Sequence, residues 1–172
     1  MSPEDPALSP ATPEQLFARL DALGIRYVTN HHPPAFTVEQ GNAVWGLIPG
    51  MHCKNLFLKD AKARLWLVVA PAEQRVDLKT LPERIGSARL SFGAPPLLEE
   101  VLGVTPGTVT PFALINDPQH RVTVVLDEGM MAQPLLNYHP LTNEATTTLT
   151  NEDLRKFLAA CGHRVMVVPL GD

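Results

Sequence analysis

The segment KNLFLKDAKARLWLVVA, residues 54–70, decides the fold class. It contains two apolar runs of strand length, Asn55–Leu58 and Leu65–Ala70, separated by the polar stretch Lys59–Arg64. Short apolar runs bounded by polar turn residues are typical of β-strands, and a short connection pairs such strands antiparallel. The segment therefore predicts a β-hairpin.

Helix signals lie on both sides of this hairpin. The sequences Thr12-Pro13-Glu14-Gln15 and Thr150-Asn151-Glu152-Asp153 each place a capping residue before an apolar pattern of helical period. Further helices are predicted over Thr37–Leu47, Asp77–Ile85 and Pro95–Leu102. Further strands are predicted at Ile25–Val28, Ala88–Phe92, Thr146–Leu149 and Arg164–Val168, with a second hairpin from Val109–Ile115 and Arg121–Leu126. Hairpins separated by irregularly placed helices indicate an α+β domain, with a mixed, largely antiparallel sheet flanked by helices.

Composition limits the class of protein. The chain has 172 residues and a formal net charge of −4, which favours one domain, over residues 12–172, after a disordered leader at residues 1–11. An acidic protein is not expected to coat DNA, since affinity for a nucleic-acid backbone grows with the phosphates neutralised. No apolar run reaches the length of a membrane span, and the first residues do not resemble a secretion signal. We therefore expect a cytoplasmic protein that uses no metal and no cofactor.

Lys54 is the first candidate functional residue, because it stands at the entrance of the first hairpin strand. A lysine in this position can direct its ammonium group into a cleft to hold a phosphate or a carbonyl group. It can equally be a solvated lysine at a strand end. Its neighbours His52 and Cys53 do not suggest a thiolate–imidazole pair, since adjacent residues of an extended segment point apart.

Two loops offer further candidates. The segment from Gly103 to Pro111 holds two glycines and two prolines, so its backbone N–H groups can approach a ligand closely, although a simple turn explains the same residues. His139 lies before Pro140, with Asn143 and Thr146 nearby, and can orient water or substrate or be structural. His31, His32 and His139 contain the atoms of a metal site, but they do not have the spacing of ligands on a helix.

These stretches occur together, in this order, in one family. They are Phe36-Thr37-Val38-Glu39, Lys54–Asp60, Leu102–Phe112, and His139-Pro140 with Asn143 and Thr146. The chain resembles a free-standing prolyl-tRNA editing protein of the YbaK/ProX type, related to the editing insertion domain of bacterial prolyl-tRNA synthetases. The resemblance runs from about Thr12 to Val168.

The resemblance implies a barrel-like mixed sheet and hydrolysis of mischarged tRNA(Pro). It implies catalytic roles for Lys54, Gly107 and His139, and substrate contacts for a further set of residues. That set is Thr108, Val109, Thr110, Pro111, Asn143 and Thr146. Thr108 departs from the serine usual in the family. The family is thought to use the 2′-hydroxyl of the terminal adenosine to position or activate water, and this sequence offers no convincing Ser–His–Asp or Cys–His set.

Three functions follow from these expectations. The motifs look most like those of the alanine-specific members, so the expected substrate is Ala-tRNA(Pro), with Cys-tRNA(Pro) as the alternative. A synthetase pocket built for proline cannot strongly reject a smaller amino acid, because one methylene is worth only about 1–3 kcal/mol. The third reading is a non-catalytic module that binds a synthetase or an aminoacyl-like ligand. The expected partners are the acceptor end of tRNA(Pro) and, in addition, prolyl-tRNA synthetase.

Overall fold

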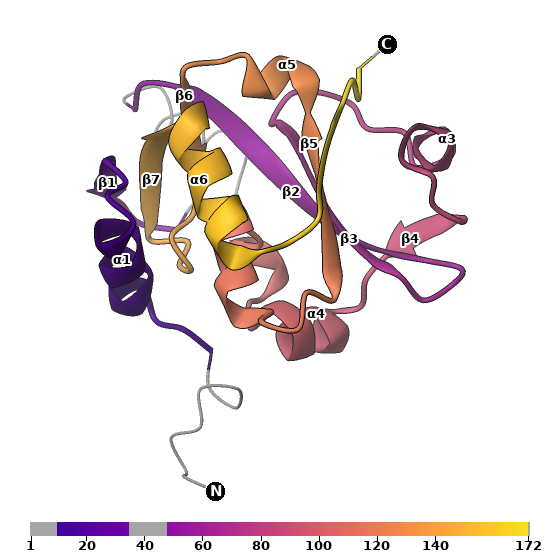
Figure 1. The fold of residues 1–172 in the computed structure, drawn as a ribbon, viewed down its shortest axis with the longest axis horizontal. Helices are drawn as coiled ribbons and strands as arrows, with labels where there is room; N and C mark the ends of the chain where they lie inside the picture. The colour runs from indigo at the N-terminus through magenta and orange to yellow at the C-terminus, as the bar shows by residue number, and fades with distance from the viewer. Residues whose placement is uncertain (1–9, 35–47, 172) are drawn as a thin grey trace, which may run out of the picture.

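The computed structural model describes residues 10–34 and 48–171 (Figure 1). Its strands form one eight-stranded mixed sheet in the order β1-β7-β6-β2-β3-β5-β8, and β4 pairs with β2. Four of the ladders are antiparallel (β1–β7, β6–β7, β2–β3 and β2–β4), and three are parallel (β2–β6, β3–β5 and β5–β8). The strands are β1 (Tyr27–His31), β2 (Met51–Asp60), β3 (Leu65–Pro71), β4 (Leu90–Phe92), β5 (Val122–Asp127), β6 (Leu135–Tyr138), β7 (Ala145–Thr150) and β8 (Val165–Val168). The predicted α+β class with a mixed, helix-flanked sheet is confirmed.

The first predicted hairpin is the centre of this sheet. Strands β2 and β3 pair antiparallel from Cys53 opposite Pro71 to Lys59 opposite Leu65. β3 is buried along nearly its whole length, because β5 covers its other edge and core side chains cover both of its faces. A strand buried on both faces reads as a continuous apolar run, which is the pattern that the sequence shows.

Two helices begin where the capping signals place them. Thr12 accepts a hydrogen bond from the Gln15 N–H, and the Gln15 side chain accepts one from the Thr12 N–H, so the predicted capping box is present. Thr150 caps the last helix through the Asp153 N–H. The helices are α1 (Pro13–Ala22), α3 (Leu81–Ile85), α4 (Pro95–Leu102), α5 (Glu128–Met131) and α6 (Asn151–Cys161), with 3-10 helices η2 (Pro106–Thr108) and η3 (Pro111–Asn116).

The second predicted hairpin is wrong. Residues 111–116 form the 3-10 helix η3, and β5 pairs parallel with β3 and β8. Pro111 fixes the first position of η3 and has no N–H, while the Thr110 side chain accepts a hydrogen bond from the Phe112 N–H. A short apolar run is compatible with a buried helical turn as well as with a strand, so periodicity alone misassigned it.

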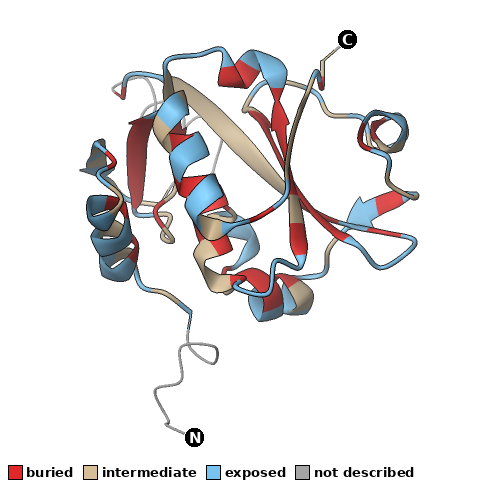
Figure 2. Ribbon diagram, in the orientation of Figure 1, coloured by how far each residue is buried: buried red, intermediate tan, exposed pale blue. Residues whose placement is uncertain are grey.

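Two cores lie on opposite faces of the sheet. The larger core contains residues of α1, α4, η3 and α6, and α6 crosses the front of the sheet in Figure 1. The smaller core contains Leu58, Trp66 and Val68 of the hairpin together with Leu81 and Ile85 of α3. Figure 2 shows that the burial on α6 is confined to one stripe, so this helix has one packed and one solvent-facing side.

Two predicted segments near the N-terminus fall wholly or mostly outside the described residues. The helix expected at Thr37–Leu47 and most of the expected leader lie outside the described residues. At the end of that leader, the Ala11 N–H donates a hydrogen bond to Asn116 Oδ1 at 2.7 Å. The helix predicted from Asp77 begins only at Leu81, because the Asp77 side chain accepts from the Lys79 N–H and holds a turn. Within the described ranges, no helix has the length and apolarity needed to cross a bilayer.

Candidate functional site

A small hollow lies where the first half of β2 runs parallel to β6. Its volume is about 20 Å³, which is room for one group of the size of a water molecule. β2 contributes three lining residues, the end of β6 and the residue after it contribute three, and β7 contributes one. They are His52, Cys53, Asn55, Asn137, Tyr138, His139 and Thr146. The hollow is therefore lined mainly by polar side chains, between the first half of β2, the end of β6 and the start of β7.

His139 is one of the lining residues of the hollow. Its Nδ1 lies 3.0 Å from the Ala145 carbonyl oxygen, which can only accept, so Nδ1 carries a proton and, in the neutral ring, Nε2 is an acceptor. Burial lowers the pKa of His139 below its ordinary value of 6.5; the hydrogen bond to Ala145 opposes this shift, and nearby His32 adds to it. No described residue bonds to Nε2, so this nitrogen can accept a hydrogen bond from water or from a hydroxyl group in the hollow.

His32 directly follows β1, the edge strand that neighbours β7, and bonds to one of the lining residues of the hollow. Its Nδ1 lies 2.9 Å from the Pro33 carbonyl oxygen and its Nε2 lies 2.8 Å from Thr146 Oγ1. The carbonyl accepts from Nδ1, so in neutral His32 the Nε2 atom accepts the hydroxyl hydrogen of Thr146. The oxygen of Thr146 is then able to accept a further hydrogen bond from a group in the hollow.

Asn137 is a lining residue of the hollow whose side chain is fixed by hydrogen bonds. Its amide nitrogen donates to the Pro49 carbonyl at 2.9 Å, and its amide oxygen accepts from the Thr148 hydroxyl. Gly50 makes this arrangement possible, because its φ is +99° and a Cβ there would lie 2.9 Å from Asn137 Nδ2 and from Leu135 Cβ. Every polar atom of the Asn137 side chain is thus used inside the protein.

Cys53 is a poor nucleophile. Burial raises the pKa of its thiol to about 11, an effect that the Tyr138 hydroxyl and the Asn137 backbone only partly oppose. The thiol donates a hydrogen bond to the Met51 carbonyl oxygen at 3.6 Å. A thiol in this state is protonated at neutral pH, and the thiolate is the reactive form. Cys53 is therefore not activated for attack on a ligand.

Lys54 is near the hollow in sequence but is not one of its lining residues. It pairs with Ala70, which belongs to the smaller core, so strand alternation places it on the face opposite Asn55. It is half-buried and forms no ion pair with any residue in the described ranges. Within these ranges its ammonium group can therefore bind an anion from outside the protein. The structure does not bring Lys54 and His139 together.

The Gly107 loop also stands apart from the hollow's lining. Gly107 is exposed in η2, and a Cβ added there would meet nothing within 4 Å. The Thr108 N–H donates to the Thr105 carbonyl at 2.9 Å, so the turn itself uses this donor. Half-buried Val109 packs against the larger core, and Thr110 and Pro111 are buried. The loop reaches the hollow indirectly, through the edge-to-face contact of the Phe112 and Tyr138 rings at 6.1 Å.

Of the two remaining predicted residues, one lines the hollow and the other does not. Thr146 lines the hollow beside His139, whereas Asn143 is half-buried in the turn between β6 and β7 and is not a lining residue. In the described part of the chain, no three His, Cys, Asp or Glu side chains gather closely enough to hold a metal ion.

Sequence reasoning missed Asn55 and Asn137 and gave His32 no role beside Thr146. The contact between His32 and Thr146 joins residues 114 positions apart, so no local pattern could reveal it.

Comparison with known proteins places this chain in a family. The model of the aminoacyl-tRNA editing domain matches residues 32–157. The chain belongs to the aminoacyl-tRNA editing domain family. The match includes β2, β6 and β7, so the hollow lies inside the editing domain. The sequence-based prediction of an aminoacyl-tRNA editing enzyme is thereby confirmed.

Relatives of this editing domain extend over nearly the whole chain. The prolyl-tRNA editing protein ProX of Acetoanaerobium sticklandii is 39% identical over 91% of this chain and 96% of its own length. The prolyl-tRNA synthetase associated domain-containing protein 1 of Danio rerio is 36% identical over 87% of this chain and 82% of its own length. A solved structure named as a candidate trans-editing enzyme for prolyl tRNA synthetase covers 99% of both chains with a TM-score of 0.67. At 22% sequence identity, that structure supports the fold alone.

Proposed function

We propose that this editing domain removes alanine from mischarged Ala-tRNA(Pro) in trans, by hydrolysis of the aminoacyl ester. The ProX relative, 39% identical over 91% of this chain, supports tRNA(Pro) as the RNA. The motifs that resemble those of the alanine-specific members support alanine as the amino acid removed. Cys-tRNA(Pro) is the second candidate, because the cysteine side chain adds only a thiol to the alanine skeleton.

The observation that carries the proposal is the position of His139 in the hollow, with Nδ1 bonded to the Ala145 carbonyl and with Nε2, in the neutral ring, able to accept. An ester is already activated relative to an amide, so a positioned water molecule is a sufficient nucleophile. We infer that the 2′-hydroxyl of the terminal adenosine positions or activates this water, with His139 Nε2 holding the ribose or the water. The protonated state of Cys53 agrees with a mechanism that forms no covalent enzyme intermediate.

Lys54 and the Gly107 loop have roles outside the hollow in this proposal. The half-buried ammonium of Lys54, which has no ion-pair partner in the described ranges, would neutralise the terminal phosphate of the tRNA. The exposed backbone around Gly107 would bind the aminoacyl carbonyl as charge develops, with Thr108 to Pro111 limiting the size of the side chain. Asn143 and Thr146 would contact the substrate from the β6–β7 side. The partner is the acceptor end of tRNA(Pro), with prolyl-tRNA synthetase as a further partner, in the cytoplasm.

Deacylation of Ala-, Cys- and Pro-charged tRNA(Pro) by the purified chain tests the proposal. Rapid loss of alanine, with cysteine and proline retained, is the expected result. Loss of cysteine instead would replace the proposed substrate and keep the reaction. If all three charged tRNAs stay intact while the chain binds prolyl-tRNA synthetase in a pull-down, the non-catalytic module is the correct function.

A further inference from the structure

Asn55 carries a buried hydrogen-bond acceptor without a partner. Among the described residues, only Asn55 Oδ1 and His163 Nδ1 are buried side-chain nitrogen or oxygen atoms that make no hydrogen bond. His163 bonds to Asp117 through its other ring nitrogen and is not a lining residue of the hollow. Asn55 is a lining residue. More than about 90% of buried polar groups in proteins are satisfied, so an orphan acceptor beside a hollow indicates a donor that arrives with a ligand.

The neighbours of Asn55 present acceptors too. Thr146 Oγ1 can accept because its hydrogen is directed to His32, while His139 Nε2 is left for the ribose or the water.

Three donors around the hollow are meanwhile used inside the protein. The Asn137 amide donates to Pro49, the Tyr138 hydroxyl to Met130 Sδ, and the Cys53 thiol to Met51. A group that donates more than one hydrogen bond would therefore satisfy Asn55 Oδ1 and Thr146 Oγ1 together.

An ammonium group meets this requirement. It carries three N–H donors and no acceptor, and it has about the size of the water molecule for which the hollow has room. An aminoacyl ester contains one such group, the α-ammonium. Hydrogen bonds that involve a charged partner are about twice as strong as neutral ones, so even the uncharged amide oxygen of Asn55 gains from this donor.

We propose that Asn55 Oδ1 accepts a hydrogen bond from the α-ammonium group of the substrate and thereby selects α-aminoacyl esters over other acyl esters. This inference rests on the proposed function, because it assumes an aminoacyl ester in the hollow. Asn55 is then a specificity-determining residue that recognises the amino group of the ester. The alanine side chain itself has no polar group that the protein could recognise.

The test compares two esters that differ only in the amino group, Ala-tRNA(Pro) and propionyl-tRNA(Pro). Wild-type protein is expected to favour the alanyl ester in kcat/KM by about 10- to 100-fold, the effect of one hydrogen bond to a charged group. Asn55→Leu should remove this preference by lowering the alanyl rate, with the propionyl rate within about threefold of wild type. Asn55→Asp, which keeps an acceptor, should preserve the preference. The matched control is Asn30→Leu, at an exposed position of β1, which should change neither rate.

A stability measurement separates this role from a structural one. If Asn55 is kept for substrate, Asn55→Leu should leave the melting temperature unchanged or raise it, since it removes an unsatisfied acceptor. A lower melting temperature, an equal loss of rate on both esters, or no loss on either would overturn the inference.

Binding distinguishes failure of this inference from failure of the proposed function. The probes are 3′-amide analogues of alanyl- and propionyl-adenosine, which cannot be hydrolysed at an ester. If no charged tRNA is deacylated, the proposed function fails; tighter binding of the alanyl analogue to wild type, lost in Asn55→Leu, would still support the role of Asn55. Equal binding of the two analogues, or binding of neither, would overturn it.

Discussion

The two halves of β2 use buried polar groups in opposite ways. At the hairpin end, Asp60 is only 3% exposed, yet its carboxylate accepts hydrogen bonds from three backbone N–H groups and two side chains. In the first half of the strand, Asn55 has a buried oxygen with no hydrogen-bond partner, and His139 beside it has a ring nitrogen that bonds to no described residue. The same strand thus carries a satisfied network at its hairpin end and an unsatisfied acceptor in its first half.

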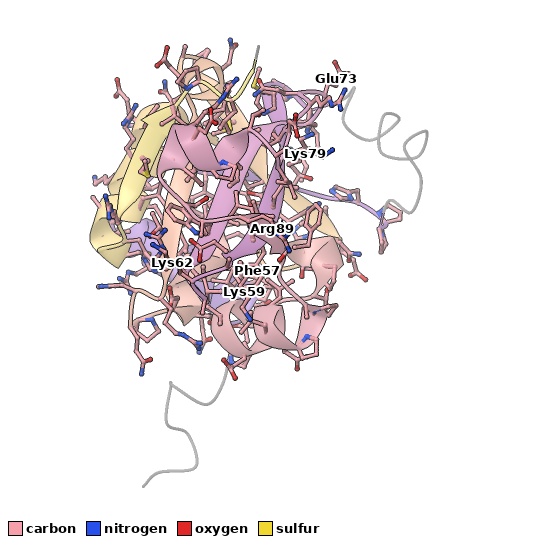
Figure 3. All side chains as sticks on the ribbon, turned by 90° about the vertical axis from the view of Figure 1, so that its right-hand side faces the viewer. Phe57, Lys59, Lys62, Glu73, Lys79 and Arg89 are labelled. Carbon is pink, nitrogen blue, oxygen red and sulfur yellow. The ribbon has the colours of Figure 1, made fainter. Side chains whose placement is uncertain are left out.

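This difference separates stability from function. A fully paired buried carboxylate fixes the geometry of the turn. If the turn opened, each donor would lose its hydrogen bond to the carboxylate and would bond to water instead. An unpaired buried acceptor lowers stability, so one that faces a hollow points to a role other than folding. Figure 3 views the hairpin side of the molecule, where exposed Lys59, Lys62 and Arg89 lie, and these exposed side chains supply matched controls for the hollow.

Asp60→Asn should have the largest effect, on stability alone. The amide cannot accept from all five donors, so we expect a loss of about 3–4 kcal/mol in the free energy of unfolding. The rate of deacylation by the folded variant should match wild type. Urea unfolding and single-turnover hydrolysis measure the two quantities, with exposed Glu73→Gln as control.

The pH dependence of this effect follows from the carboxyl group. Burial acts to raise the pKa of Asp60, but the N–H groups of Arg64, Ala88 and Lys62 and the Trp66 indole outweigh it and hold the pKa at about 2, below the ordinary 3.8. The stabilisation is therefore complete above pH 3.8 and is lost as the pH falls towards 2. If wild type and Asp60→Asn lose stability equally over this range, the contrast between the two halves of β2 is wrong.

Lys54→Ala should lower the rate of Ala-tRNA(Pro) deacylation by about 100-fold, as expected for loss of a charged anchor on a phosphate. Lys59→Ala, five residues along the same strand at the hairpin end, should leave the rate within about twofold of wild type. Single-turnover rates at low and moderate salt provide the measurement. Equal effects of the two substitutions would show that lysines on β2 act only through general charge.

Gly50→Ala should reduce stability and activity together. The added Cβ would lie 2.9 Å from Asn137 Nδ2, and alanine rarely adopts a φ of +99°, so we expect a loss of about 2 kcal/mol. Because Asn137 is a lining residue of the hollow, the deacylation rate should fall as well. Gly107→Ala is the matched variant, since its Cβ would meet nothing, and its melting temperature should equal that of wild type. A stable and fully active Gly50→Ala protein would remove Asn137 from the account of the site.

Local signals predicted much of the fold. The capping boxes located α1 and the start of α6, and the apolar runs located β2 and β3, because these features depend on neighbours in sequence. The sequence did not reveal β6, a four-residue strand whose partners β2 and β7 lie elsewhere in the chain. The segment at residues 111–116 was misassigned because its conformation depends on the prolines and on packing beside α4 and α6.

The site was less accessible to sequence reasoning. Two of the expected residues, His139 and Thr146, do line the hollow together, as their common motif indicated. Lys54 and Gly107 do not line it, and their roles remain predictions. Asn55 became a candidate only from its burial and missing partner, since an asparagine beside a lysine in a strand has no distinctive pattern.

The pH–rate profile of Ala-tRNA(Pro) hydrolysis tests most directly whether the hollow performs the reaction. After subtraction of the uncatalysed rate, wild type should keep a constant single-turnover rate down to below pH 6.5 and then lose it, since burial lowers the pKa of His139 and only the neutral ring can accept. His139→Ala should be at least about 100-fold slower and should lack this acid limb. A limb at or above pH 6.5, or an active His139→Ala protein, would contradict the account.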